Sequence, residues 1–209
     1  MEFQKVTLPQ TDTESEKKIT ASKIPFDFSV IKGMAMRVNP AFSYAEETPV
    51  FKEIYDLLYA GKGILIIGSI GSGKTYLMEF FAAFMASMQK GFRVVPSAWI
   101  IRDCINNPAL ISGYGRESFA AGDIKRPITI CFDDLGMEPG ESKIYGNSVS
   151  IMTEILIDRY IMQQRFGMKT HATSNLTIDE LQEKYGDRSA SRFRSMFNIL
   201  VMDGKDRRK

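Results

Sequence analysis

Residues 63–75, with the sequence GILIIGSIGSGKT, join a short apolar run to a glycine-rich segment. The apolar run from Gly63 to Gly68 has the length and composition of a strand that is buried on both faces of a sheet. The segment from Gly68 to Thr75 satisfies the pattern G-x-x-x-x-G-K-[ST] at every position, and a helical pattern follows it. A strand, a glycine-rich loop and a helix in this order predict a loop whose backbone N–H groups surround a phosphate.

This loop predicts how a nucleotide is bound. Lys74 is expected to reach the β- and γ-phosphates as a point charge, and the Thr75 hydroxyl is expected to hold Mg²⁺. ATP and Mg²⁺ are therefore the expected cofactors. The expected nucleotide-binding residues are Gly68, Ser69, Ile70, Gly71, Ser72, Gly73, Lys74, Thr75 and Tyr76.

Polar residues end two other predicted strands. Asp133 and Asp134 follow the apolar run 128–132, and Asn175 follows the run 168–173. Parallel strands bind ligands at their carboxyl ends, so we expect Asp133 at the metal and Asp134 beside the attacking water. The Asn175 amide is placed to hydrogen-bond the γ-phosphate or that water. Because aspartate is also frequent in turns, an ordinary turn is the alternative for the Asp pair.

Strand and helix patterns alternate along the chain, which predicts an α/β fold with a parallel sheet covered on both faces. The expected strands are 63–68, 92–95, 128–132, 168–173 and 199–202, and the expected helices are 49–61, 75–89, 98–106, 148–165, 178–185 and 190–197. Together with the phosphate loop, these patterns predict a P-loop NTPase, a three-layer sandwich with five parallel strands. The polar residues 9–23 lack apolar periodicity, so we expect a flexible tail at 1–24 and one domain at 25–209.

Composition argues against several classes of protein. The 44% hydrophobic and 25% charged residues are typical of an ordinary globular domain. No apolar run approaches the roughly 18 residues of a membrane span, and the first residues lack a signal-peptide core, so we expect a cytoplasmic protein without a membrane partner. Cys104 and Cys131 lack metal-ligand spacing, and His171, the single histidine, is expected in the sheet rather than in catalysis. Residues 184–209 contain eight basic and three acidic residues, which favours phosphate-bearing partners or forms a solvated face.

Four motifs beside the phosphate loop together resemble those of one family. They are DDLG at 133–136, IDRY at 157–160, TSNL at 173–176 and YGDRSASR at 185–192. Over about residues 45–208, the chain looks like the AAA+ ATPases of the bacterial helicase-loader type, the DnaC/DnaI family and its transposition relative IstB. The resemblance implies an AAA+/RecA-like core, and the short sequence after Arg208 implies a minimal lid domain or none.

The resemblance also implies roles for individual residues. Lys74 and Thr75 would be Walker A, Asp133 and Asp134 Walker B, Asn175 sensor 1, Arg188 and Arg192 the arginine-finger box, and Arg208, or else Arg207, sensor 2. Arg188 and Arg192 are four residues apart and would share one helix face, from which an arginine could reach the γ-phosphate of a neighbouring subunit. A solvated basic helix is the alternative for these two arginines.

The function implied by this resemblance is ATP hydrolysis in DNA replication, as a helicase-loader-like switch on single-stranded DNA. Its partners would be a replicative helicase and further copies of the chain, which would associate through the nucleotide site. Hydrolysis would be slow without oligomerisation or DNA. DNA contact is expected from the basic C-terminal segment and from Lys143, Tyr145 and Asn147.

Three alternative functions stay open at this point. The chain could be an IstB-like transposition helper that works with a transposase, a P-loop kinase for a small molecule, or a non-hydrolysing nucleotide-binding adaptor. The loaders carry an N-terminal docking module before the ATPase core. Because only about 45 residues precede the core here, we expect that module to be missing or reduced.

Overall fold

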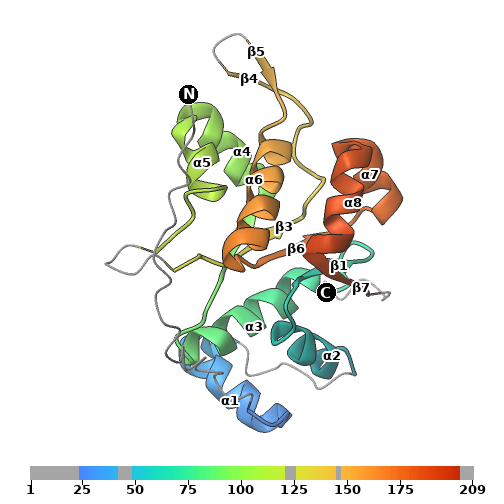
Figure 1. The fold of residues 1–209 in the computed structure, drawn as a ribbon. Helices are drawn as coiled ribbons and strands as arrows, with labels where there is room; N and C mark the ends of the chain where they lie inside the picture. The colour runs from blue at the N-terminus through green and yellow to red at the C-terminus, as the bar shows by residue number, and fades with distance from the viewer. Residues whose placement is uncertain (1–23, 42–48, 121–125, 145–146, 203–209) are drawn as a thin grey trace, which may run out of the picture.

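The computed structural model describes residues 24–41, 49–120, 126–144 and 147–202 (Figure 1). A five-stranded sheet lies at its centre, with every strand parallel to its neighbours in the order β2-β3-β6-β1-β7. The strands are β1 (Gly63–Ile67), β2 (Arg93–Pro96), β3 (Ile130–Asp133), β6 (Thr170–Ser174) and β7 (Phe197–Val201). The predicted five-stranded parallel sheet is confirmed.

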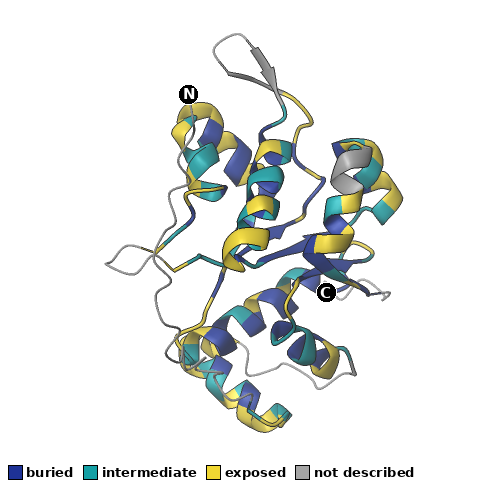
Figure 2. Cartoon of the chain, viewed as in Figure 1, coloured by how far each residue is buried: buried dark blue, intermediate teal, exposed yellow. Residues whose placement is uncertain are grey.

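Helices cover both faces of this sheet (Figure 1). Three helices share the core on the first side: α1 (Phe28–Val38), which packs against α3, α2 (Pro49–Leu58) and α3 (Lys74–Ser87). Five helices share the core on the second side: α4 (Ser97–Asn106), α5 (Ala109–Tyr114), α6 (Ile151–Phe166), α7 (Ile178–Tyr185) and α8 (Asp187–Met196). Strand β1 is apolar throughout because it serves both cores, with Ile64 and Ile66 on the first face and Leu65 and Ile67 on the second. Buried residues accordingly fill the sheet and the inward sides of the helices (Figure 2). Among the described residues, no helix has the length and apolar character that crossing a membrane requires.

Helix α1 was not predicted from the sequence. Asp27 caps it, since its Oδ1 accepts hydrogen bonds from the backbone N–H groups of Ser29 (2.9 Å) and Val30 (3.3 Å). The ring of Phe28 lies edge-on to that of Phe51, with 5.1 Å between their centroids. An eleven-residue helix is marginal alone, so α1 is stabilised by packing against Phe51 of α2 and against α3, where the Phe28 ring stacks on that of Phe80 with 6.5 Å between centroids.

A small antiparallel hairpin precedes α6, formed by β4 (Ser142–Ile144) and β5 (Asn147–Val149). The predicted start of this helix at residue 148 was wrong, because residues 147–149 pair with β4 and the helix begins only at Ile151. Helix α5 was also not predicted. The last helix begins at Asp187 instead of residue 190, and β7 begins at Phe197 instead of residue 199.

A buried guanidinium joins the second helical layer to the sheet. Arg159 on α6 is fully buried, and it donates hydrogen bonds to the Thr170 hydroxyl (2.6 Å) and to three backbone carbonyls. These carbonyls belong to Tyr114 (2.9 Å), Ile128 (2.9 Å) and Lys169 (2.8 Å). Burial lowers the pKa of Arg159 to about 9, so the group remains charged at neutral pH. One side chain thus holds the end of α5, the segments before β3 and β6, and β6 itself together.

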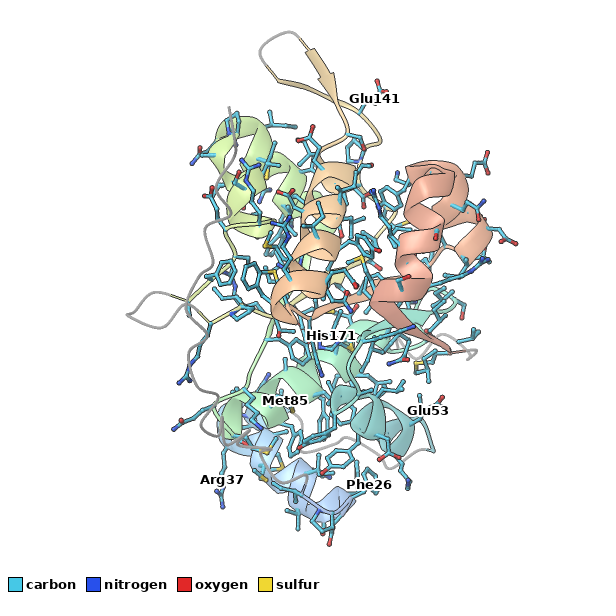
Figure 3. The ribbon with its side chains drawn as sticks, viewed as in Figure 1. Phe26, Arg37, Glu53, Met85, Glu141 and His171 are labelled. Atoms are coloured by element: carbon cyan, nitrogen blue, oxygen red, sulfur yellow. The ribbon has the colours of Figure 1, made fainter. Side chains whose placement is uncertain are left out.

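His171 lies in the sheet, as the sequence predicted, at the centre of the molecule (Figure 3). Its Nδ1 accepts a hydrogen bond from the backbone N–H of Ile64 at 3.0 Å, and the Phe92 ring centroid lies 4.7 Å from its own. Burial, reinforced by the charges of Lys169 and Arg159, lowers the pKa of His171 to about 3. The imidazole is therefore neutral in the folded protein at any ordinary pH.

Because this imidazole stays neutral in the folded protein, we expect the stability of the protein to fall in acid. Between about pH 6.5 and pH 3, His171 is protonated in the unfolded chain but stays neutral in the folded protein. Protonation therefore stabilises the unfolded chain alone, and the free energy of unfolding falls as the pH falls. The loss at pH 5 is expected to be about 2 kcal/mol relative to pH 7.5. In His171→Asn, the amide oxygen can replace the Nδ1 acceptor without titrating. Urea denaturation of both proteins across this range measures the effect, and parallel pH profiles would contradict it.

Candidate nucleotide-binding site

The glycine-rich loop connects β1 to α3 at the carboxyl end of the sheet. Gly71 and Gly73 have φ angles of +78° and +96°, in the left-handed region that glycine adopts without strain. A Cβ atom on Gly68 would lie 2.1 Å from the backbone oxygen of Met202, so this position excludes any side chain. The loop geometry therefore explains three of the glycines in the motif.

Lys74 opens α3, and its ammonium group is held at the centre of the site. Only 4% of the residue is exposed. Its Nζ donates hydrogen bonds to the backbone oxygens of Gly68 (2.9 Å) and Ser69 (2.8 Å) and to Oδ1 of Asn175 (2.7 Å). The charge expected to meet the phosphates thus lies between the loop and the end of β6.

Thr75 and Asp133 meet although 58 positions separate them in the chain. The Thr75 hydroxyl donates to Asp133 Oδ1 at 2.9 Å, and the Thr173 hydroxyl donates to the same oxygen at 2.6 Å. Asp133 is buried, and partial burial followed by the charge of Asp133 raises the pKa of nearby Glu79. A hydroxyl beside one buried carboxylate fits the oxygen ligands that Mg²⁺ takes from a protein when phosphates supply the others.

Asp134 adopts an unusual backbone conformation. Its φ angle is +51°, which few residues other than glycine adopt. Two hydrogen bonds hold it there, because its N–H donates to Thr173 Oγ1 at 3.0 Å and its Oδ1 accepts from Asn175 Nδ2 at 3.1 Å. Such conformations are stabilised by their surroundings and concentrate at functional sites.

The Asn175 amide bridges the two expected catalytic groups. Its oxygen accepts from the Lys74 ammonium and its nitrogen donates to the Asp134 carboxylate, so both ends of the amide are assigned by their partners. A phosphate that draws the Lys74 ammonium away from Asn175 would therefore also alter the hydrogen bond between Asn175 and Asp134. This arrangement fits the predicted role of Asn175 next to the γ-phosphate.

The remaining predicted site residues have less defined surroundings. Ile70 at the loop tip and Tyr76 in α3 are 57% and 37% exposed. Both predicted finger arginines lie on α8, where the Arg192 guanidinium stacks 5.5 Å from the centroid of the Tyr160 ring. The side chains of the others are not described: Arg188 on α8, Lys143 and Asn147 in the hairpin, and Tyr145, Arg207 and Arg208 outside the described ranges.

Two further residues that shape this site were not predicted from the sequence. Thr173 contacts Asp133 and Asp134 together, and its position at the polar end of β6 is the only sequence signal for that role. Glu138 is 2% exposed and accepts a hydrogen bond from the N–H of Gly136. A glutamate four residues after the second aspartate of a DDLG motif could have been noted, but its burial is visible only in the structure.

No protein-family model matches this sequence, and no curated protein matches it. Solved structures do match its fold. The DnaC helicase loader aligns with a TM-score of 0.53 and 15% identity, covering 80% of this chain and 98% of that one. DnaI aligns with a TM-score of 0.57 and 17% identity, covering 85% of this chain and 99% of that one. The chain has the fold of the DnaC helicase loader and of DnaI, a parallel sheet with helices on both faces.

The predicted resemblance to the DnaC/DnaI type is thus confirmed for the fold. A further structure, that of the replication initiator DnaA bound to AMPPCP and single-stranded DNA, aligns with a TM-score of 0.50 and 16% identity. It covers 80% of this chain but 46% of that one.

Proposed function

We propose that this chain is an ATPase of the DnaC/DnaI type, a nucleotide-dependent switch that binds single-stranded DNA and acts on a replicative helicase. The observation that carries the proposal is the hydrogen-bonded connection from Lys74 through Asn175 to Asp134. It joins the groups expected at the γ-phosphate to the group expected at the attacking water. The fold shared with the DnaC helicase loader, and with DnaA in a complex with AMPPCP and single-stranded DNA, supports the choice of process.

Each residue of the site then has a defined task. Lys74 neutralises charge that develops on the transferred phosphoryl group, in a loop whose N–H groups bind the other phosphate oxygens. Thr75 and Asp133 would hold Mg²⁺, which supplies further charge neutralisation when it is bound. Asp134 orients and polarises the attacking water, while Asn175 keeps the Asp134 carboxylate turned toward the phosphates. Hydrolysis would then switch the protein between an assembled, DNA-bound state and a released one.

We further propose that Arg188 completes the site of a neighbouring subunit. Arg192 is engaged with Tyr160 on its own chain, which argues against Arg192 as the residue that acts in trans. An arginine supplied by a neighbouring subunit raises the rate of phosphoryl transfer about 10³- to 10⁵-fold. An isolated subunit should therefore bind ATP and hydrolyse it slowly.

The test is ATP turnover at several protein concentrations, with and without single-stranded DNA. We expect turnover per subunit to rise with protein concentration and with DNA. Arg188→Ala should lower it by about 10³-fold, and adding Lys74→Ala subunits, which cannot use their own site but still carry Arg188, should restore it. Arg194→Ala, a change of an exposed arginine on the same helix, is the matched control. Turnover that ignores both DNA and protein concentration would refute the proposal, and stimulation by duplex DNA alone would favour the IstB-like alternative.

A further inference from the structure

A buried carboxylate lies just beyond the Asp133–Asp134 pair. Glu138 accepts a hydrogen bond at Oε2 from the N–H of Gly136 (2.8 Å) and one at Oε1 from the hydroxyl of Tyr185. Its backbone oxygen also accepts from Lys184 Nζ at 2.7 Å. Both Lys184 and Tyr185 belong to the last turn of α7, so Glu138 ties the turn after β3 to the end of that helix.

The turn that carries Glu138 is itself held firmly. The Leu135 N–H donates to the backbone oxygen of Thr173 at 2.8 Å, and the Ser174 hydroxyl donates to the Leu135 oxygen at 2.6 Å. Gly136 has a φ angle of +97°, and a Cβ atom there would lie 2.6 Å from the side chain of Leu176. A displacement of Asp134 can therefore be passed along the turn, because little space exists to absorb it.

Tyr185 stands at the junction between α7 and α8. The next residue, Gly186, has a φ angle of +83° and separates the two helices, and α8 begins at Asp187. The Tyr185 ring also packs edge-on against Phe193 of α8, with centroids 5.7 Å apart. Burial, followed by the charge of Glu138, raises the pKa of Tyr185 well above its usual value, so its hydroxyl is a permanent donor. Arg188 is three residues further along the chain.

We propose that Glu138 is a positioning residue that couples the turn after Asp134 to α8. Through this coupling, the nucleotide bound by one subunit sets the position in which that subunit presents Arg188 to the next subunit. The role in trans rests on the proposed function above. The coupling within one chain rests only on the contacts of Glu138 and Tyr185. It gives the subunit a means of linking its own nucleotide state to the activity of its neighbour.

The test distinguishes the subunit that supplies Arg188, the donor, from the subunit whose nucleotide site receives it, the acceptor. Acceptor subunits carry Arg188→Ala and an intact site, and donor subunits carry Lys74→Ala. Turnover is measured at ATP concentrations high enough to fill the weakened donor site as well. Tyr185→Phe removes one hydroxyl and keeps the ring against Phe193. When added to the donor, it is expected to lower the restored turnover about tenfold, because the lost hydrogen bond is to a buried carboxylate. When added to the acceptor, it should have a clearly smaller effect. Equal turnover with changed and unchanged donors would overturn the proposal.

If donors without the Tyr185 change fail to restore turnover, the action of Arg188 in trans is refuted. The coupling within one chain is then tested by a second measurement. Amide hydrogen exchange is followed with and without AMPPCP. We expect AMPPCP to slow exchange in both α3 and α8 of the unchanged protein, and in Tyr185→Phe to slow it in α3 only. A protected α8 in Tyr185→Phe, or no change in α8 of the unchanged protein, would overturn the coupling. Tyr59→Phe, which removes a hydroxyl that contacts Met88 on the first face, is the matched control.

Discussion

Replacing Lys74 with alanine should lower ATP turnover by at least about 10²- to 10³-fold, the effect of removing a charged donor aimed at developing negative charge. The ammonium is already desolvated, since 4% of the residue is exposed and Asn175 and two loop carbonyls bind it. Its attraction for a phosphate is therefore less weakened by water than that of a surface lysine. Nucleotide affinity should fall as well, because the same charge faces the phosphates in the ground state.

Steady-state turnover and equilibrium binding of a fluorescent ATP analogue measure the two effects separately. Lys52→Ala is the matched control, because Lys52 forms an exposed ion pair with Asp56 on α2. Lys74→Arg tests whether charge alone suffices, and we expect it to fail because a planar guanidinium cannot replace the contacts made by a compact ammonium. Turnover by Lys74→Ala within tenfold of the unchanged protein would mean that the loop binds nucleotide without using this lysine for hydrolysis.

Replacing Arg159 with methionine should lower the free energy of unfolding by about 3–5 kcal/mol, a large part of the stability of an ordinary domain. Methionine fills much of the space but leaves the Thr170 hydroxyl and the carbonyls of Tyr114, Ile128 and Lys169 without their donor. An unpaired buried acceptor costs about 1–3 kcal/mol. The Phe132 ring also loses the guanidinium, whose Cζ lies 5.6 Å from the ring centroid.

Urea denaturation measures this loss, and Arg165→Met provides the comparison. Arg165 is exposed on the same helix, so its replacement should change stability by no more than about 0.5 kcal/mol. Arg159→Lys should be nearly as unstable as Arg159→Met, because one ammonium cannot reach acceptors that the guanidinium meets in different directions. A loss below about 1 kcal/mol for Arg159→Met would show that water or a rearranged loop satisfies these acceptors.

The local features of the chain were predicted well because they depend on neighbouring residues. The phosphate loop is a continuous segment, and the φ angles of Gly71 and Gly73 follow from residue types that tolerate them. The apolar run of β1 predicts burial on both faces without knowledge of its partners. The error at residues 147–149 arose between two local alternatives, because these residues pair with β4 only a few positions earlier instead of joining α6.

The sequence by itself determined the phosphate loop, the five parallel strands and the identity of the residues at the strand ends. The tertiary structure decided which of these residues touch. Strand β6 lies between β1 and β3, so Asn175 is placed between Lys74 and Asp134, and Thr173 reaches Asp133. Neither this strand order nor the contact between Glu138 and Tyr185 follows from local pattern. Both depend on free energy gained by packing segments tens of residues apart, which no short stretch of sequence contains.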